Sequence, residues 1–166
     1  MDGDGAGSSW HIDHLGDHPG SIPQLAQWHH EEWSTLNPGG TVKQRIKSLS
    51  WHLAQGQIPA TYVAVLEGAV VGSASLIERD MAAYIQLSPW LAGVYVAPAY
   101  RRRGIGSALV RRVADEAAGF GITTLYLFTP GRERFYRRLG WEVLERTVYR
   151  RHRVAVMALG LPGGAC

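Results

Sequence analysis

The sequence predicts a mixed α/β fold, in which helices cover both faces of a central sheet. Residues 91–108 read as a buried strand, a short basic glycine turn and the start of a helix. Residues 122–128 read as another buried strand, and a strand–helix–strand succession makes its two strands parallel. A hairpin expected at 61–77 adds antiparallel strands, so the predicted sheet is mixed.

The first half of the chain is predicted to hold a strand, two helices and the hairpin. Its first strand alternates apolar and polar residues. Ser21 with Gln24, and Thr41 with Gln44, have the spacing of capping boxes, and apolar residues follow each pair at helical intervals. Glu67-Gly68 marks the hairpin turn. The expected elements are strand 10–14, helix 21–34, helix 41–55, and strands 61–66 and 69–77.

The second half is predicted to hold the phosphate-end helix, a short helix and a last hairpin. A polar connection at 78–90 comes first, and glycines close each helix. The expected elements are strand 91–97, helix 104–118, strand 122–128, helix 132–139, and strands 141–149 and 153–159. The whole order is therefore β-α-α-β-β-β-α-β-α-β-β.

The turn before the long helix has the features of an anion site. Arg101–Arg103 precede Gly104, and Gly106 follows one residue later. Free backbone N–H groups and the positive end of the helix dipole attract anions, and glycines let the backbone approach closely. A phosphate or pyrophosphate is the expected ligand, although an ordinary glycine-containing turn would also read this way.

Two well-known phosphate-binding motifs do not fit this turn, and a third pattern does. A dinucleotide fingerprint needs a third glycine where Leu109 stands, and a P-loop needs a lysine that is absent nearby. Val-x-Val-x-Pro followed by Arg-x-x-Gly-x-Gly, residues 94–106, resembles the acyl-CoA pyrophosphate loop of the GNAT superfamily of N-acetyltransferases. Residues 135–141, Phe-Tyr-Arg-Arg-Leu-Gly-Trp, resemble that family's Phe-Tyr-x-x-x-Gly-Phe segment.

This resemblance covers nearly the whole chain and implies a GNAT-like fold with splayed central parallel strands. A single acetyltransferase domain is expected over residues 10–159, between a flexible tail at 1–9 and a C-terminal tail at 160–166.

The resemblance also implies that acetyl-CoA is the cosubstrate. Its pantetheine would pair with the backbone of Val94 and Val96, and its pyrophosphate would bind the N–H groups of residues 102–107. Thr129 stands near the place where the family usually has an asparagine that contacts the pantetheine, and it would supply a hydroxyl there. The expected cofactor residues are Val94, Tyr95, Val96, Arg101, Arg102, Arg103, Gly104, Ile105, Gly106, Ser107, Thr129 and Tyr136.

The implied reaction moves an acetyl group to a primary amine of a small molecule or peptide N-terminus, by direct attack in a ternary complex. Tyr136 is the family-matched acid for the leaving thiolate, and a backbone N–H near Val96 would polarise the carbonyl. Strand 91–96 lacks the carboxylate that many relatives use as a base, so Asp80 and Glu78 are candidates. Further candidates on the first helix are His29, His30, Glu31 and Glu32.

The acceptor pocket is expected between the first two helices, the 78–90 connection and the 149–153 turn. The wall mixes acidic and basic residues, so a polyamine, an aminoglycoside, an amino acid and a peptide N-terminus all stay open. No metal is expected, because the His-His-Glu-Glu run lacks i, i+4 spacing and a third ligand. The candidate lining residues are Trp28, Glu31, Glu32, Trp33, Trp90 and Tyr149.

Composition bears on partners and compartment. A net charge of +3 with pI about 9.2 is modest, and aromatic residues do not interleave with basic ones on a strand, so nucleic acid is not expected. No apolar run is long enough for a membrane span. A single cysteine, Cys166, and no secretory signal favour the cytoplasm. A monomer or homodimer is expected, and a non-catalytic acyl-CoA sensor is the alternative function.

Overall fold

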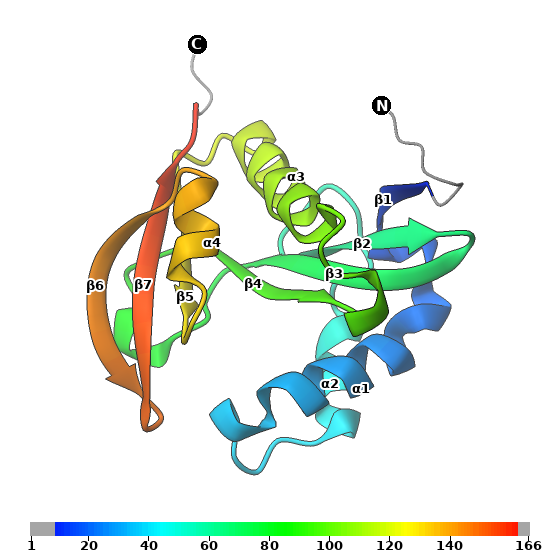
Figure 1. Cartoon of the computed structure of the whole chain (residues 1–166), viewed down its shortest axis with the longest axis horizontal. Helices are drawn as coiled ribbons and strands as arrows, with labels where there is room; N and C mark the ends of the chain where they lie inside the picture. Colours follow the sequence, from blue (N-terminus) through cyan, green and yellow to red (C-terminus); the bar gives the residue numbers. More distant parts are fainter. Residues whose placement is uncertain (1–8, 163–166) are drawn as a thin grey trace.

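The computed structural model describes residues 9–162, so the tails predicted at 1–9 and 160–166 lie largely outside it. The predicted order of elements is confirmed, and the strands form one sheet in the order β1-β2-β3-β4-β5-β7-β6 (Figure 1). The strands are β1 (Trp10–His14), β2 (Ala60–Leu66), β3 (Ala69–Ile77), β4 (Trp90–Val96), β5 (Thr124–Thr129), β6 (Glu142–Tyr149) and β7 (His152–Gly160). The helices are α1 (Ile22–Trp33), α2 (Val42–Ser50), α3 (Ile105–Gly119) and α4 (Glu133–Arg138).

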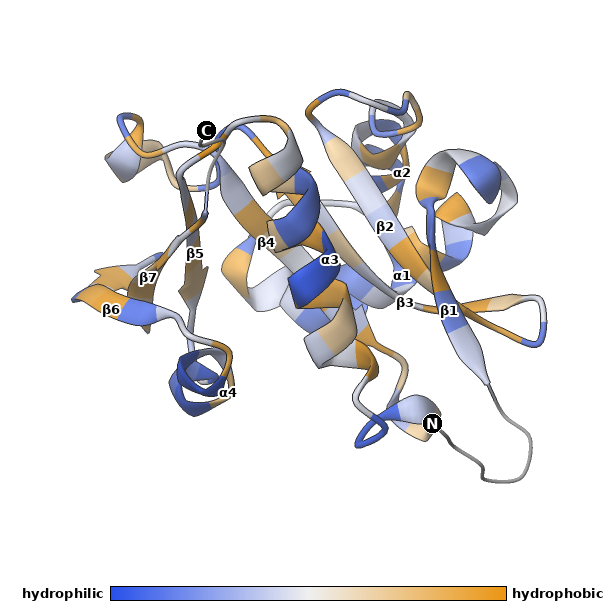
Figure 2. Cartoon of the chain, turned by 90° about the horizontal axis from the view of Figure 1, so that it is seen from above, coloured by the Kyte–Doolittle hydropathy of each residue, from blue (hydrophilic) through white to orange (hydrophobic). Residues whose placement is uncertain are grey.

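Different helices cover the two faces of the sheet. α3 and α4 lie on one side of the molecule, and α1 and α2 lie on the other (Figure 1). Side chains of β2 alternate between these layers: Tyr62 and Ala64 join the core under α3, whereas Val63 and Val65 pack with α1 and α2. Figure 2 shows polar residues along the outer side of α3, as expected for an amphipathic helix.

The two central strands separate almost at once. β4 and β5 run parallel, but they share a single pair of facing residues, Trp90 and Tyr126. Beyond that pair the ribbons diverge and leave a gap between β1–β4 and β5–β7 (Figure 1). The splay implied by the family resemblance is therefore present.

A β-bulge in β4 accompanies the splay. The register between β3 and β4 shifts between Ser73 and Ser75, which leaves Gly93 and Val94 opposite Ala74. Gly93 has φ +61°, a left-handed conformation that favours glycine. The isolated glycine in this strand pattern was the sequence signal for the bulge, which was not predicted.

Two local predictions for the N-terminal half were wrong. α2 ends at Ser50 instead of residue 55, because the chain turns to bury His52, whose Nδ1 lies 2.7 Å from Thr61 Oγ1 on β2. Ser21 does not cap α1, because its hydroxyl donates to the carbonyl of His18 at 2.7 Å. The capping box of Thr41 at the start of α2 is confirmed.

Gly72 provides a test of how tightly β3 and β4 pack under α3. A Cβ there would lie 2.7 Å from the Tyr95 carbonyl oxygen and 3.3 Å from Leu109 Cδ1. We expect Gly72→Ala to lower the free energy of unfolding by about 1–3 kcal/mol, as overpacking does. The matched control is Gly119→Ala at the end of α3, where a Cβ meets nothing within 4 Å. Denaturant titrations measure the free energy of unfolding of both variants. An equal loss in the two would contradict this packing.

Candidate functional site

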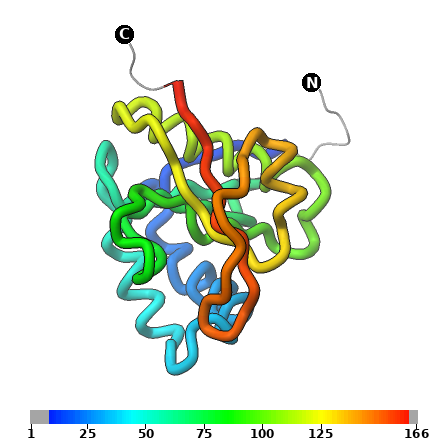
Figure 3. The backbone as a smooth tube through the Cα atoms, turned by 90° about the vertical axis from the view of Figure 1, so that its left-hand side faces the viewer, coloured from blue at the N-terminus to red at the C-terminus, as the bar shows by residue number. Residues whose placement is uncertain are grey.

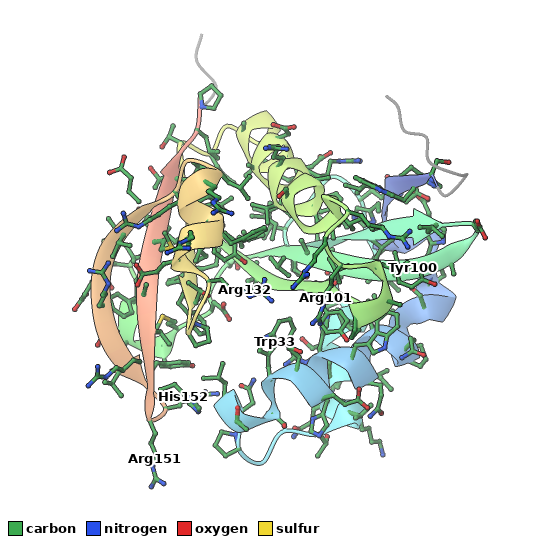
Figure 4. The ribbon with its side chains drawn as sticks, in the orientation of Figure 1. Trp33, Tyr100, Arg101, Arg132, Arg151 and His152 are labelled. Carbon is green, nitrogen blue, oxygen red and sulfur yellow. The ribbon has the colours of Figure 1, made fainter. Side chains whose placement is uncertain are left out.

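The splay opens into a cleft of about 1130 Å³. The cleft runs from the N-terminus of α3 to the space enclosed by α1, α2 and the β6–β7 turn. Arg101 and Arg132, from the loops before α3 and α4, point into the gap between β4 and β5, and Trp33 extends toward it from α1 (Figure 4). A smaller groove of about 570 Å³ lies between α4 and the β6–β7 hairpin.

Most residues singled out from the sequence line this cleft. They are Asp80, Val94, Tyr95, Val96, Arg101, Arg102, Gly104, Ile105, Gly106, Ser107, Thr129 and Tyr136, with His29, Glu32, Trp33 and Tyr149 at the other end. Six others do not line it: Trp28, His30, Glu31, Glu78, Trp90 and Arg103.

The residues outside the cleft have other positions. Trp90 is 0% exposed in the core, where its indole donates to the Leu87 carbonyl at 2.7 Å. Trp28 stacks on the Tyr95 ring at a centroid distance of 5.5 Å, and Arg103 lies over Tyr100. Glu31 and Glu78 are exposed.

The first turn of α3 presents free backbone N–H groups to the cleft. Gly104 caps the helix in the left-handed conformation, with φ +82°. The first amide that bonds back to this cap is that of Ala108, at 3.1 Å from the Gly104 oxygen. The N–H groups of Ile105, Gly106 and Ser107 therefore have no intrahelical acceptor, which makes this end an anion site.

The exposed edge of β4 adds a separate free donor to the cleft. Ala97 donates its N–H to Val71 on β3 at 2.8 Å, and successive backbone N–H groups in a strand point to opposite sides. The N–H of Val96 therefore points into the gap. The Val96 carbonyl accepts a hydrogen bond of 2.7 Å from Arg101 Nε, so one backbone group of this edge already has a side-chain partner.

Tyr136 lies across the gap from this edge, on α4. The rings of Phe135 and Trp141 pack edge-on against it, at centroid distances of 4.9 and 6.0 Å. Burial raises the pKa of Tyr136 to about 12, with Arg132 acting in the opposite direction, so the hydroxyl is protonated at neutral pH. That hydroxyl makes no hydrogen bond within residues 9–162, which leaves it available as a donor.

A buried histidine ties α1 to the bulge of β4. Ser73 Oγ donates to the Gly93 carbonyl at 2.9 Å and lies 2.8 Å from His29 Nε2. Because the serine proton is used, His29 Nε2 must carry the hydrogen in this pair, and Nδ1 is unprotonated. His29 is 1% exposed, and its Nδ1 has no partner among the described residues. Burial, reinforced by the charge of Arg45, lowers its pKa to about 3.

Charged side chains gather at the end of the cleft beside α2. Asp80 and Arg45 are half-buried and both line it. Burial raises the pKa of Asp80 to about 6, while Arg45 and Arg150 act in the opposite direction. The carboxylate is therefore close to half-protonated near pH 6 and can accept a proton from a ligand.

The β6–β7 turn closes this end by contacting the connection after α1. Arg150 Nη1 donates to the Leu36 carbonyl at 2.9 Å and to Asn37 Oδ1 at 2.7 Å. Figure 3 shows the turn lying against this connection. The neighbouring Arg151, at the tip of the turn, is exposed and points away from the molecule (Figure 4).

Several cleft residues were not found from the sequence. They are Arg45, His52 and Ser75 at the acceptor end, and Tyr100, Arg132, Phe135 and Arg138 near α3 and α4. Arg45 reads as an ordinary polar position of an amphipathic helix, so no local signal marks it. Phe135 stands beside Tyr136 in the quoted motif, and that adjacency was the signal available for it.

The described residues contain no group of three or more histidine, cysteine, aspartate or glutamate side chains that could hold a metal ion. Within the same part of the chain, no helix has the length and apolar character that crossing a membrane requires.

A family comparison decides what this arrangement is. Residues 58–143, which run from before β2 into β6, match the model of the acetyltransferase (GNAT) domain. The chain belongs to the GNAT acetyltransferase family. It is an acetyltransferase, and the resemblance of its two motifs to that family is confirmed. No curated protein matches its sequence.

Several solved structures share its fold at low sequence identity. An aminoglycoside 6′-N-acetyltransferase complexed with coenzyme A has a TM-score of 0.72 at 17% identity, over 90% of this chain and 96% of that one. NAA60 of Arabidopsis thaliana, solved with a bisubstrate analogue, has 0.69 at 15%, over 94% and 100%. YncA of Salmonella typhimurium, solved with its cofactor acetyl-CoA, has 0.66 at 18%, over 97% and 98%.

The buried state of His29 predicts how this GNAT domain responds to acid. An unfolded histidine takes up a proton near pH 6.5, whereas folded His29 stays neutral down to about pH 3. The contribution of His29 to the free energy of unfolding is complete above pH 6.5. It is lost as pH falls, by up to about 1.4 kcal/mol per pH unit. Asp80, whose pKa is raised, acts in the opposite direction between pH 6 and 4.

Comparison with a variant isolates the histidine. His29→Gln keeps an amide donor for Ser73 and removes the titrating ring. We expect its free energy of unfolding to fall less steeply than that of the wild type between pH 6.5 and 4.5. Urea titrations at several pH values measure both slopes, and parallel slopes would contradict a neutral buried His29.

Proposed function

We propose that this protein transfers an acetyl group from acetyl-CoA to a primary amine, by direct attack in a ternary complex. The observation that carries the proposal is that two sets of free backbone donors line one cleft. One is the Val96 N–H on the unpaired edge of β4, and the other is the first turn of α3. A pantetheine arm followed by a pyrophosphate has the polarity to accept from both.

The cofactor would take the place of a missing strand beside β4. Its pantetheine amides would pair with backbone groups of Val94 and Val96, and its pyrophosphate would accept from the N–H groups of residues 102–107. Arg101 would leave the Val96 carbonyl, where it now donates at 2.7 Å, and turn to the phosphates. Arg132 and Arg138 also line this end and add positive charge.

The reaction needs a polarised carbonyl, a neutral amine and an acid for the leaving thiolate. The Val96 N–H would stabilise the developing oxyanion. The amine nitrogen forms a bond to the acetyl carbon as the carbon–sulfur bond breaks. The Tyr136 hydroxyl would give its proton to the sulfur, while the nitrogen would lose one proton to solvent as the amide forms. Solvent would return a proton to the tyrosinate, and the products are an amide and CoA thiol.

Asp80 is the proposed base for the incoming ammonium. Its pKa of about 6 makes it mostly ionised at neutral pH and still able to hold a proton. It faces the cleft, unlike Glu78, which is exposed outside it. His29, with a pKa of about 3, is too weak a base for this role.

Binding of acetyl-CoA is the first test. A ligand that binds only the folded state stabilises it, by about 2.7 kcal/mol at a hundred times Kd. We expect a clear rise in Tm with acetyl-CoA, no rise in Gly106→Asp, and a partial rise in Gly106→Ala. A Cβ at Gly106 meets only Phe135 Cζ at 3.6 Å and Val96 Cγ2 at 3.8 Å, so both variants should fold. The aspartate, however, would repel the pyrophosphate.

Differential scanning fluorimetry with and without acetyl-CoA measures these shifts. An equal rise in the wild type and Gly106→Asp would place the pyrophosphate elsewhere. Release of CoA thiol that depends on an added amine separates an acetyltransferase from a non-catalytic acyl-CoA sensor, which would bind without turnover.

Tyr136→Phe tests the proposed acid. The change removes one hydroxyl and preserves the packing against Phe135 and Trp141, so stability and acetyl-CoA binding should hardly change. We expect kcat to fall by roughly 10²-fold, which is about 3 kcal/mol of transition-state stabilisation. Measurement of kcat and Tm on one preparation distinguishes this from a structural role, for which Tm would fall and kcat would stay near normal.

A further inference from the structure

Two opposite charges face the acceptor end of the cleft without neutralising each other. Arg45 on α2 and Asp80 after β3 are both half-buried and line the same space. Within residues 9–162 neither side chain forms an ion pair or a side-chain hydrogen bond. Each group still influences the other electrostatically, so they lie in the same region but outside contact distance.

The other cation at this end is already engaged. Arg150 uses Nη1 to bind the connection after α1 through Leu36 and Asn37, which fixes its position. Arg45 is therefore the guanidinium that keeps its full set of donors. A partly desolvated guanidinium without a partner is unfavourable, and an anion supplied by a ligand removes that penalty.

We propose that the acceptor is a small amine that also carries a carboxylate, an α-amino acid, with its carboxylate on Arg45 and its amino group at Asp80. This inference rests on the proposed function, because it names the substrate of that same site. A zwitterion of this kind pairs both charges at once, which neither charge of the protein achieves with the other.

The other residues that line this end of the cleft indicate which kind of amino acid side chain it would accept. Trp33, Leu36, Leu49, Ile77 and Tyr149 line the same end of the cleft. Trp33 extends from α1 toward the gap (Figure 4). These groups offer apolar and aromatic surface, so an apolar or aromatic side chain, as in leucine or phenylalanine, suits the pocket.

The charge balance disfavours the other classes of amine. Two guanidinium groups, Arg45 and Arg150, face this end beside one half-buried carboxylate, Asp80, and Glu32 is exposed at its edge. A polyamine or aminoglycoside would bring several positive charges toward the arginines. A peptide N-terminus lacks a carboxylate at the α-carbon and would leave Arg45 without a partner.

The experiment compares each amino acid with two close analogues. The probes are L-phenylalanine, its amide and phenethylamine, and L-leucine, its amide and isoamylamine, each assayed for CoA thiol release with acetyl-CoA. The amide is the more weakly basic amine and a larger share of it is neutral, so it should react faster if the carboxylate is not recognised. It also stands in for a peptide N-terminus.

We expect kcat/KM for the amino acids to exceed that for both analogues by about 30-fold or more, the effect of a partly buried charge pair. Arg45→Gln should remove this preference by raising KM for the amino acids. A Tm near that of the wild type, and a rise in Tm with acetyl-CoA, show that the variant folds. Lys47→Gln, an exposed cation on the same helix outside the cleft, is the matched control and should keep the preference.

Each other outcome contradicts a defined statement. Equal or faster reaction of the amides, or a preference that survives Arg45→Gln, overturns the acceptor class and leaves the proposed function standing. Bound acetyl-CoA, seen as a rise in Tm, without thiol release from any amine overturns the proposed function itself.

Discussion

Two parallel strands that part after one pair of residues leave a row of backbone N–H and C=O groups inside a sheet without a partner. Buried backbone groups are strongly unfavourable when unpaired. In this chain the row belongs to β4, beyond Trp90, where β5 no longer follows. The rest of the structure either holds these strands apart or presents groups to the space between them.

The bulge at Gly93 and Val94 is held by buried polar side chains. His29, Ser73 and the Gly93 carbonyl form one chain of hydrogen bonds from α1 to β4. A second chain links His52 through Thr61 Oγ1 to Ser75 Oγ, with both steps at 2.7 Å. Polar groups in a core are tolerated when they are satisfied, and the first of these chains fixes the position of the strand that carries the donors. Within that chain His29 Nδ1 has no partner among the described residues, and it belongs to a residue that lines the cleft.

What the sequence predicted well was local in the chain. The glycine turn before α3 is recognisable because left-handed backbone at Gly104 and a free helix N-terminus are set by a few consecutive residues. The order of elements followed from periodicity for the same reason. Tyr136 was singled out only because it matches a family motif. Its place across the gap depends on how α4 packs, which no local pattern shows.

What could not be predicted depended on contacts between distant segments. Arg45 and Asp80 are 35 positions apart, and they line the same cleft only because the fold brings α2 and the segment after β3 to it. Arg150 reaches Leu36 across more than a hundred residues. Trp90, expected in the acceptor pocket, is instead in the core, because its side chain points to the face of β4 that packs against Val154 and Val156. Periodicity predicts that a strand has two faces but not which of them borders the cleft.

A structure of the protein with bound CoA tests the central claim most directly. The account predicts pantetheine in the gap between β4 and β5, hydrogen-bonded to the backbone of Val94 and Val96. It also predicts pyrophosphate oxygens on the N–H groups of residues 102–107, and Arg101 released from the Val96 carbonyl. CoA bound in the groove between α4 and the β6–β7 hairpin, with the edge of β4 still free, would contradict it.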